Sequence, residues 1–191
     1  MLESLYISKS KIRQSLLTLF FTNPSGRYYL RELQRLLGYS AGSIRRELLR
    51  FQKDNLFNTD KVGNLLFYSI NTSHPLFKEL KSIVSKTVGV EGSLKKTLSS
   101  INGIKIAFIY GSFASKKENS ASDIDLMIIG NPNTSSLNEK IAELEKRLKR
   151  EINPTIYSLQ EYKIKKKTRR GFIMDLLKNP KIMLAGKEND L

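Results

Sequence analysis

The spacing of hydrophobic residues in the first quarter of the chain predicts three short helices. Apolar side chains recur there every three or four positions in three successive runs, which is the pattern of a helix with one buried face. The runs cover residues 9–22, 30–37 and 40–55. Gly38 is placed to end the second helix, and Ser40 is placed to cap the third.

The pattern changes to short strands directly after the third helix. Residues 56–59 and 65–70 favour strands, and the polar link between them, residues 60–64, contains a glycine, as is typical of a hairpin. Three helices followed by a hairpin is the element order of a winged helix-turn-helix, whose last helix enters the major groove of DNA. We therefore predict a DNA-binding domain of this kind over residues 1–72.

The third predicted helix carries basic side chains away from its apolar stripe. These side chains, with a lysine in the hairpin, are placed to contact base edges or phosphates of DNA. The candidates are Ser43, Arg45, Arg46, Arg50 and Lys61. Two alternatives stay open: a solvated helix of an ordinary domain presents the same basic face, and winged helices also serve as protein-binding modules.

A helical connector is expected over residues 73–101. Pro75 suits the first turn of a helix, and Gly89 with Gly92 is expected to interrupt the helical pattern. An apolar stripe runs along the segment, and either a homodimer seam or packing against the C-terminal domain explains it. We favour the homodimer, because helix-turn-helix proteins usually pair to span two half-sites.

Strands and helices alternate over residues 102–191, which we predict to form a second domain. The fold class expected for the whole chain is α+β: a winged helix-turn-helix joined by a helical connector to a small domain with a mixed sheet flanked by helices. Strands are expected at residues 104–110, 124–129, 152–158 and 182–184, and helices at residues 135–150, 160–167 and 170–178.

The composition and charge of the chain limit the kinds of partner and the cellular compartment that we expect. The 191 residues carry a net charge of +15, with eleven Lys and Arg against five Asp and Glu in residues 1–75 and 22 against 13 in residues 76–191. This widespread positive charge favours polyanions such as nucleic acid and nucleotides. The absence of cysteine excludes disulfides and Cys-bound zinc. No apolar run approaches the ~18 residues of a membrane span, and the N-terminus lacks a signal-peptide layout, so we expect a cytoplasmic protein without a membrane partner.

The candidate catalytic and ligand-binding residues lie at the ends of two predicted strands. The first strand leads into Gly111-Ser112, and ten residues later Asp123-Ile124-Asp125 opens the next strand. Alternate strand residues point the same way, so Asp123 and Asp125 share a face with Cα atoms about 7 Å apart. Mg²⁺ prefers a couple of carboxylates together with phosphate oxygens and water. The pattern therefore predicts a seat for Mg²⁺ and a nucleoside triphosphate.

The same motif resembles the signature of the polymerase-β-like nucleotidyltransferases, in particular the small MNT type with Gly-Ser-x-Ala-Arg-Gly followed by Ser-Asp-Ile-Asp-Leu. The whole chain resembles a group of prokaryotic, largely archaeal, transcriptional regulators that join a winged helix to such a domain. The resemblance implies that Gly111 and Ser112 hold the phosphates of a nucleoside triphosphate, ATP by preference. It implies that Asp123 and Asp125 are catalytic and bind Mg²⁺, or Mn²⁺ in its place. The family's arginine is lost here, and we expect Lys116 or Lys117 to supply positive charge to the triphosphate in its place.

The implied reaction is Mg²⁺-dependent transfer of a nucleoside monophosphate to an acceptor hydroxyl. MNT-type proteins often modify a HEPN-type toxin, so the resemblance also implies a protein partner. The family has a third carboxylate on a later strand, where this chain offers Asn153 or Thr155. With two of three expected carboxylates, whether the chain is an enzyme stays open. The alternative is a DNA-binding regulator whose second domain senses nucleotide or acts as an antitoxin-like partner module.

Overall fold

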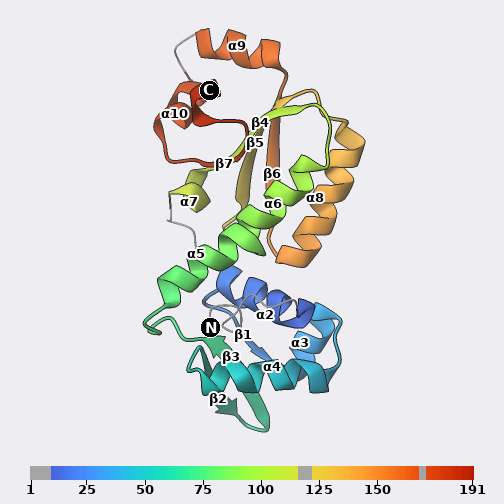
Figure 1. The fold of residues 1–191 in the computed structure, drawn as a ribbon, viewed down its shortest axis with the longest axis vertical. Coiled ribbons are helices and arrows are strands. Elements are labelled where there is room, and N and C mark those ends of the chain that lie inside the picture. The colour runs from blue at the N-terminus through green and yellow to red at the C-terminus, as the bar shows by residue number, and fades with distance from the viewer. Residues whose placement is uncertain (1–9, 116–121, 168–170) are drawn as a thin grey trace. The chain divides into compact units, whose positions relative to one another are not determined.

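The computed structural model describes residues 10–115, 122–167 and 171–191 and divides the chain into two compact units, Met1–Val90 and Glu91–Leu191 (Figure 1). The boundary lies inside the segment that we expected to be a connector. Its first helix packs into the core of the first unit through Leu80 and Val84. The second helix carries the buried Leu94 and Leu98 and lies almost wholly in the second unit. Homodimer formation stays a prediction.

The first unit contains the expected order of three helices and a hairpin, with one short additional strand and a closing helix. Its sheet is antiparallel throughout, and the strand order is β1-β3-β2. The elements are α2 (Lys11–Thr22), β1 (Arg27–Tyr29), α3 (Leu30–Leu37), α4 (Ala41–Lys53), β2 (Phe57–Val62), β3 (Leu65–Ile70) and α5 (Phe77–Thr87).

Local signals in the sequence explain where these helices begin and end. The Ser40 side chain accepts a hydrogen bond from the Ser43 amide and caps α4, as expected. Gly38 adopts a left-handed φ of 72° and ends α3. Packed aromatic rings join the helices to the hairpin in the core, because the ring centroid of Phe57 in β2 lies 4.4 Å from that of Phe20 and 4.9 Å from that of Phe51.

The hairpin is tighter than the sequence suggested. Asp60 and Lys61, which we expected in the connecting link, instead pair with Phe67 and Leu66 of β3. The turn consists of Gly63 and Asn64, and Gly63 has a φ of 58° that favours glycine. Backbone pairing therefore continues further toward the tip than polar composition alone indicates.

The second unit is built on a mixed four-stranded sheet, as expected. The strand order is β6-β5-β4-β7, and β5 and β6 are parallel while the other pairs are antiparallel. The elements are α6 (Val90–Ser99), β4 (Ile104–Tyr110), α7 (Gly111–Ala114), β5 (Ile124–Gly130), α8 (Thr134–Leu148), β6 (Ile152–Tyr157), α9 (Leu159–Lys167), α10 (Phe172–Lys178), β7 (Ile182–Ala185) and a final 3-10 turn (Glu188–Asp190). The expected break at Gly92 is wrong, because Gly92 lies within α6 and the chain bends at Val88 and Gly89.

Helices cover both faces of this sheet. Phe108 of β4 and Met127 of β5 are fully buried in one cluster with Tyr162 of α9 and with Ile173 and Leu176 of α10. Helices α6 and α8 run side by side (Figure 1), and α8 buries its apolar stripe of Leu137, Ile141, Leu144 and Leu148. The parallel β5–α8–β6 crossover brings the beginnings of β5 and β6 to the same edge of the sheet.

Candidate functional site

The two halves of the Gly-Ser and Asp-x-Asp motif meet at one edge of the sheet. Tyr110, the last residue of β4, is the register neighbour of Asp125 on β5, and Asp125 is the register neighbour of Asn153 on β6. Asp123 lies two residues before Asp125 and therefore shares its face. The structure thus brings together Gly111, both aspartates and the strand that we expected to complete the site.

Gly111 is fixed at its position by two independent constraints. Its φ of 72° is a conformation that residues with a Cβ rarely adopt. A Cβ built on Gly111 would also overlap the Asp125 carboxylate. A side chain at position 111 would therefore strain the backbone and push the Asp125 carboxylate out of its place. The family resemblance implied that Gly111 holds phosphate, and the structure adds its close contact with the Asp125 carboxylate.

The two aspartates differ in their surroundings. Asp123 is exposed and accepts a hydrogen bond of 3.2 Å from the Asn153 side-chain amide. Asp125 is half-buried, and this burial raises the pKa of its carboxyl above the usual value, with a further contribution from the negative charge of Asp123. A divalent cation stabilises the ionised form of a carboxylate that burial and a neighbouring negative charge disfavour, as they do for Asp125.

The third strand supplies polar groups without a carboxylate. Thr155 Oγ1 lies 3.3 Å from the Tyr110 hydroxyl, so Thr155 is joined to β4 across the face of β5. Glu151 is exposed, and its backbone carbonyl accepts the Ile124 amide at 2.9 Å. Within the described parts of the chain, no group of three or more His, Cys, Asp and Glu side chains is placed to hold a metal ion.

These donors fit a single hard cation better than a soft metal. The carboxylates of Asp123 and Asp125 are oxygen donors, which is the ligand type of Mg²⁺, while the Asn153 amide nitrogen donates to Asp123. Mg²⁺ usually takes one or two carboxylates and completes its shell with phosphate oxygens and water. The site is therefore suited to a cation that arrives together with a phosphate-bearing ligand.

A cavity of about 500 Å³ borders the Gly111 turn. The rings of Tyr110 and Phe172 meet edge to face there, with centroids 5.7 Å apart. Its lining is Tyr110, Gly111, Ser115, Phe172, Asp175, Leu176, Asn179 and Pro180. The volume lies within the usual range for small-molecule sites. The sequence did not indicate the part contributed by α10, because no motif marks Phe172 or Asp175.

Of the two remaining residues predicted to contact phosphate, Ser112 and Lys116, the structure describes only Ser112. Ser112 lies in the short helix α7, where its carbonyl and that of Gly111 accept the Ser115 hydroxyl at 3.2 and 2.9 Å. Lys116 lies outside the described residues. The roles of Ser112 and Lys116 toward phosphate stay predictions.

The Asp125→Asn variant is expected to melt at a higher temperature than the wild type near neutral pH without divalent cations. Because the folded-state pKa of Asp125 is raised, ionisation of this carboxyl destabilises the fold once the pH exceeds the ordinary value of 3.8. The advantage of the amide should therefore shrink as the pH falls toward that value. Thermal melts of both proteins across this range, with the exposed Asp175→Asn as control, provide the measurement. An equal rise in melting temperature for Asp175→Asn would contradict the view that ionised Asp125 destabilises the fold.

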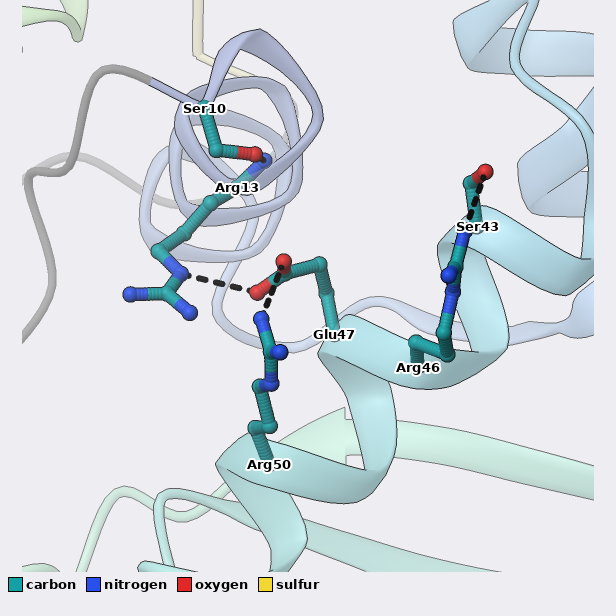
Figure 2. A network of polar contacts seen from close by, with 6 residues as sticks. All are labelled: Ser10, Arg13, Ser43, Arg46, Glu47 and Arg50. Atoms are coloured by element: carbon teal, nitrogen blue, oxygen red, sulfur yellow. Dashed lines mark hydrogen bonds and ion pairs between the residues drawn. The ribbon is translucent and has the colours of Figure 1, made fainter.

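Four of the predicted DNA-binding side chains lie on α4 and Lys61 lies on β2, not in the link between the strands, and the five are not equivalent. Figure 2 shows Glu47 between Arg13 of α2 and Arg50 of α4. Glu47 is 8% exposed and accepts hydrogen bonds from Arg13 Nε at 2.8 Å and Arg50 Nη1 at 2.9 Å. Arg50 is exposed, yet part of its charge is already neutralised by Glu47.

The other candidates on α4 lie apart from this cluster. Arg46 donates to the Ser43 hydroxyl at 3.3 Å, and the Ser40 hydroxyl donates to the same atom at 2.9 Å. Arg45 and Arg46 are both exposed. The sequence did not predict the Arg13–Glu47 pair, since the two residues are 34 positions apart.

A comparison with curated proteins finds no match. A toxin-antitoxin structure with AMP-PNP is similar at 16% identity and a TM-score of 0.38, over 52% of this chain and 76% of that one. A mutant of the toxin-antitoxin MntA-HpeT is similar at 14% identity, with the same coverage and TM-score. A candidate nucleotidyltransferase from Sulfolobus solfataricus is similar at 15% identity and a TM-score of 0.29, over 49% of this chain and 74% of that one.

None of the helices in the described parts of the chain combines the length and apolar character needed to cross a membrane.

The family assignment rests on sequence. Residues 92–185 match the family described as Polymerase beta, Nucleotidyltransferase. This match contains the Gly111 turn, both aspartates and Asn153, so the resemblance expected from the motif is confirmed for this part of the chain. Residues 92–185 therefore form a nucleotidyltransferase domain of the polymerase beta family.

Proposed function

We propose that the second unit binds a Mg²⁺-nucleoside triphosphate, ATP by preference, and transfers the nucleoside monophosphate slowly to an acceptor hydroxyl. The observation that carries this proposal is the packing of Gly111 against the Asp125 carboxylate, with Asp123 on the same face. The cavity next to Gly111 provides room for the nucleoside.

Each residue of the site has a role in this proposal. Asp123 and Asp125 hold Mg²⁺, which when bound neutralises phosphate charge and stabilises the attack at the α-phosphorus. The acceptor oxygen forms the new bond to that phosphorus, and the bond to the β-phosphate oxygen breaks to release pyrophosphate. Asn153 cannot take up the acceptor's proton at neutral pH, because an amide is not a base there. We therefore expect the proton to leave through water, and turnover to be slow.

Calorimetric titration with ATP in the presence of Mg²⁺ tests the nucleotide site. The wild type is expected to bind, and the Asp123→Asn/Asp125→Asn double variant is expected to lose that binding because both charged ligands are gone. The isosteric amides keep the shape of the site, and a single cooperative melt at a temperature no lower than that of the wild type would verify the fold. Equal binding by the double variant would contradict the proposal.

A second experiment separates transfer from sensing. Incubation with labelled ATP, Mg²⁺ and candidate acceptors, including a HEPN-type toxin, should give a labelled product that the double variant does not form. Binding without any labelled product would favour the regulator alternative, in which this domain senses nucleotide or acts as an antitoxin-like partner module.

We also propose that the first unit is a winged helix-turn-helix that binds DNA. In support, α4 follows α3 after a Gly38 stop and presents the exposed Arg45 and Arg46, and the β2–β3 hairpin carries the exposed Lys61. An exposed basic helix beside a basic hairpin suits groove and phosphate contacts. The paired charge of Arg50 makes it the weaker of the α4 arginines for this role.

The Arg46→Ala variant is expected to weaken duplex binding and to lower the salt dependence of log affinity by up to ~0.9 per lost phosphate contact. Arg50→Ala should have a smaller effect, because Glu47 already offsets its charge. Fluorescence anisotropy with duplex DNA at several salt concentrations gives both slopes. Lys78→Ala on α5 removes an equal charge elsewhere in the unit and serves as control. Equal loss in all three variants would indicate that only net charge matters.

A further inference from the structure

Arg150 is a buried charged residue that none of the roles above uses. It lies between the end of α8 and the start of β6 and is only 7% exposed. Burying a guanidinium is unfavourable unless its donors are satisfied. The position of those contacts is therefore informative about what Arg150 does.

The guanidinium contacts both halves of the nucleotide motif. Arg150 Nε donates to the Ser122 carbonyl at 3.0 Å, and Nη2 donates to the same oxygen. Its central carbon lies 5.7 Å from the centroid of the Phe113 ring. Ser122 directly precedes Asp123, and Phe113 directly follows Ser112. One side chain thus joins the segment before the aspartates to the turn that faces them.

Glu151, the residue after Arg150, holds the backbone on the C-terminal side of Asp123. The Glu151 carbonyl accepts the Ile124 amide at 2.9 Å. The backbone is therefore anchored immediately before Asp123 by the Arg150 side chain and immediately after it by the Glu151 main chain. Asp123 itself is exposed, so its carboxylate has little packing of its own to fix its direction.

We propose that Arg150 is a positioning residue that fixes Asp123 and the Gly111-Ser112 turn relative to each other. It acts through the Ser122 carbonyl and the Phe113 ring, and it stays away from the nucleotide because it is buried and already engaged. The proposal rests on the nucleotide site proposed above as far as ligand affinity is concerned. Arginine suits the role better than lysine, because a planar guanidinium donates through two nitrogens and packs flat on a ring.

The experiment compares Arg150→Lys, which keeps the charge, with Arg150→Met, which keeps the length. Phe113→Leu removes the ring, and Arg147→Lys with Arg147→Met are matched controls one turn earlier on the exposed side of α8. The first readout is amide hydrogen exchange without ligand over residues 111–113 and 122–125. Both Arg150 variants are expected to exchange about tenfold faster in both segments, while the Arg147 variants match the wild type. Phe113→Leu should act in the same direction.

The second readout is Mg²⁺-ATP affinity by calorimetry. Supporting groups of this kind change metal affinity by about ten- to a hundredfold, so both Arg150 variants should bind more weakly by that factor. Exchange that is unchanged, or faster in only one segment, would overturn the proposal, as would wild-type affinity in a variant with faster exchange. If Arg150→Met does not fold, Arg150→Lys decides. If the wild type fails to bind nucleotide, the nucleotide site is refuted, while hydrogen exchange still decides whether Arg150 joins the two segments.

Discussion

The Asn153→Asp variant is expected to bind Mg²⁺-ATP about tenfold more tightly than the wild type and to transfer the nucleotide faster, because it adds a third charged ligand. Asn153 is the register neighbour of Asp125, and its amide already lies 3.2 Å from an Asp123 oxygen. A carboxylate at this position needs no rearrangement of the backbone. It also provides a proton acceptor that an amide cannot provide.

Calorimetry and the labelled-ATP transfer assay give the two measurements. The Asn131→Asp variant makes the same chemical change directly after the other end of β5 and serves as control. Without Mg²⁺ the Asn153→Asp protein should be less stable than the wild type, since three carboxylates would then repel one another. An Asn153→Asp protein with unchanged affinity, or an equal gain in Asn131→Asp, would show that β6 does not complete the metal site.

The Glu47→Ala variant is expected to destabilise the first unit by about 3 kcal/mol, because it leaves the guanidinium of Arg13 without its carboxylate. The Arg13 and Glu47 side chains are only 13% and 10% exposed, so water replaces the lost partner poorly. Such a loss corresponds to a fall in Tm of roughly 10 °C or more for a domain of this size.

The measurement is urea or thermal unfolding of the full chain, followed by a signal that reports on the first unit. Glu79→Ala on α5 removes an exposed glutamate from the same unit and should change stability by less than about 0.5 kcal/mol. Similar values for the two variants would mean that the Arg13–Glu47 pair contributes no more than a surface ion pair.

The sequence predicted features whose physical cause is local in the chain. The capping serine at position 40, the glycine stop at position 38 and the strand alternation that aligns Asp123 with Asp125 each depend on a few neighbouring residues. The order of strands and helices followed from the same short-range patterns, whereas the mixed sheet, which the structure confirms, was expected from the resemblance to the family. Composition misled at Asp60 and Lys61, because ladder pairing with β3 outweighs their polar character.

Features that depend on distant partners were not predictable in this way. In the sequence, Glu47 is indistinguishable from an exposed charge on a solvated helix. Its burial becomes evident only once α2 packs against α4. Arg150 reads as a basic residue at a helix end, yet it contacts a carbonyl 28 positions away. The α10 wall of the cavity also depends on where β7 pairs with β4. No periodicity or motif encodes these distances.

The parallel register of β5 and β6 has an evolutionary consequence. It keeps Asn153 beside Asp125 whether or not the position carries a charge. An asparagine codon becomes an aspartate codon by a single base substitution, so full ligation lies one mutational step from the present sequence. If the proposed nucleotide site holds, a lineage with this scaffold can therefore gain or lose the third carboxylate without a change of fold.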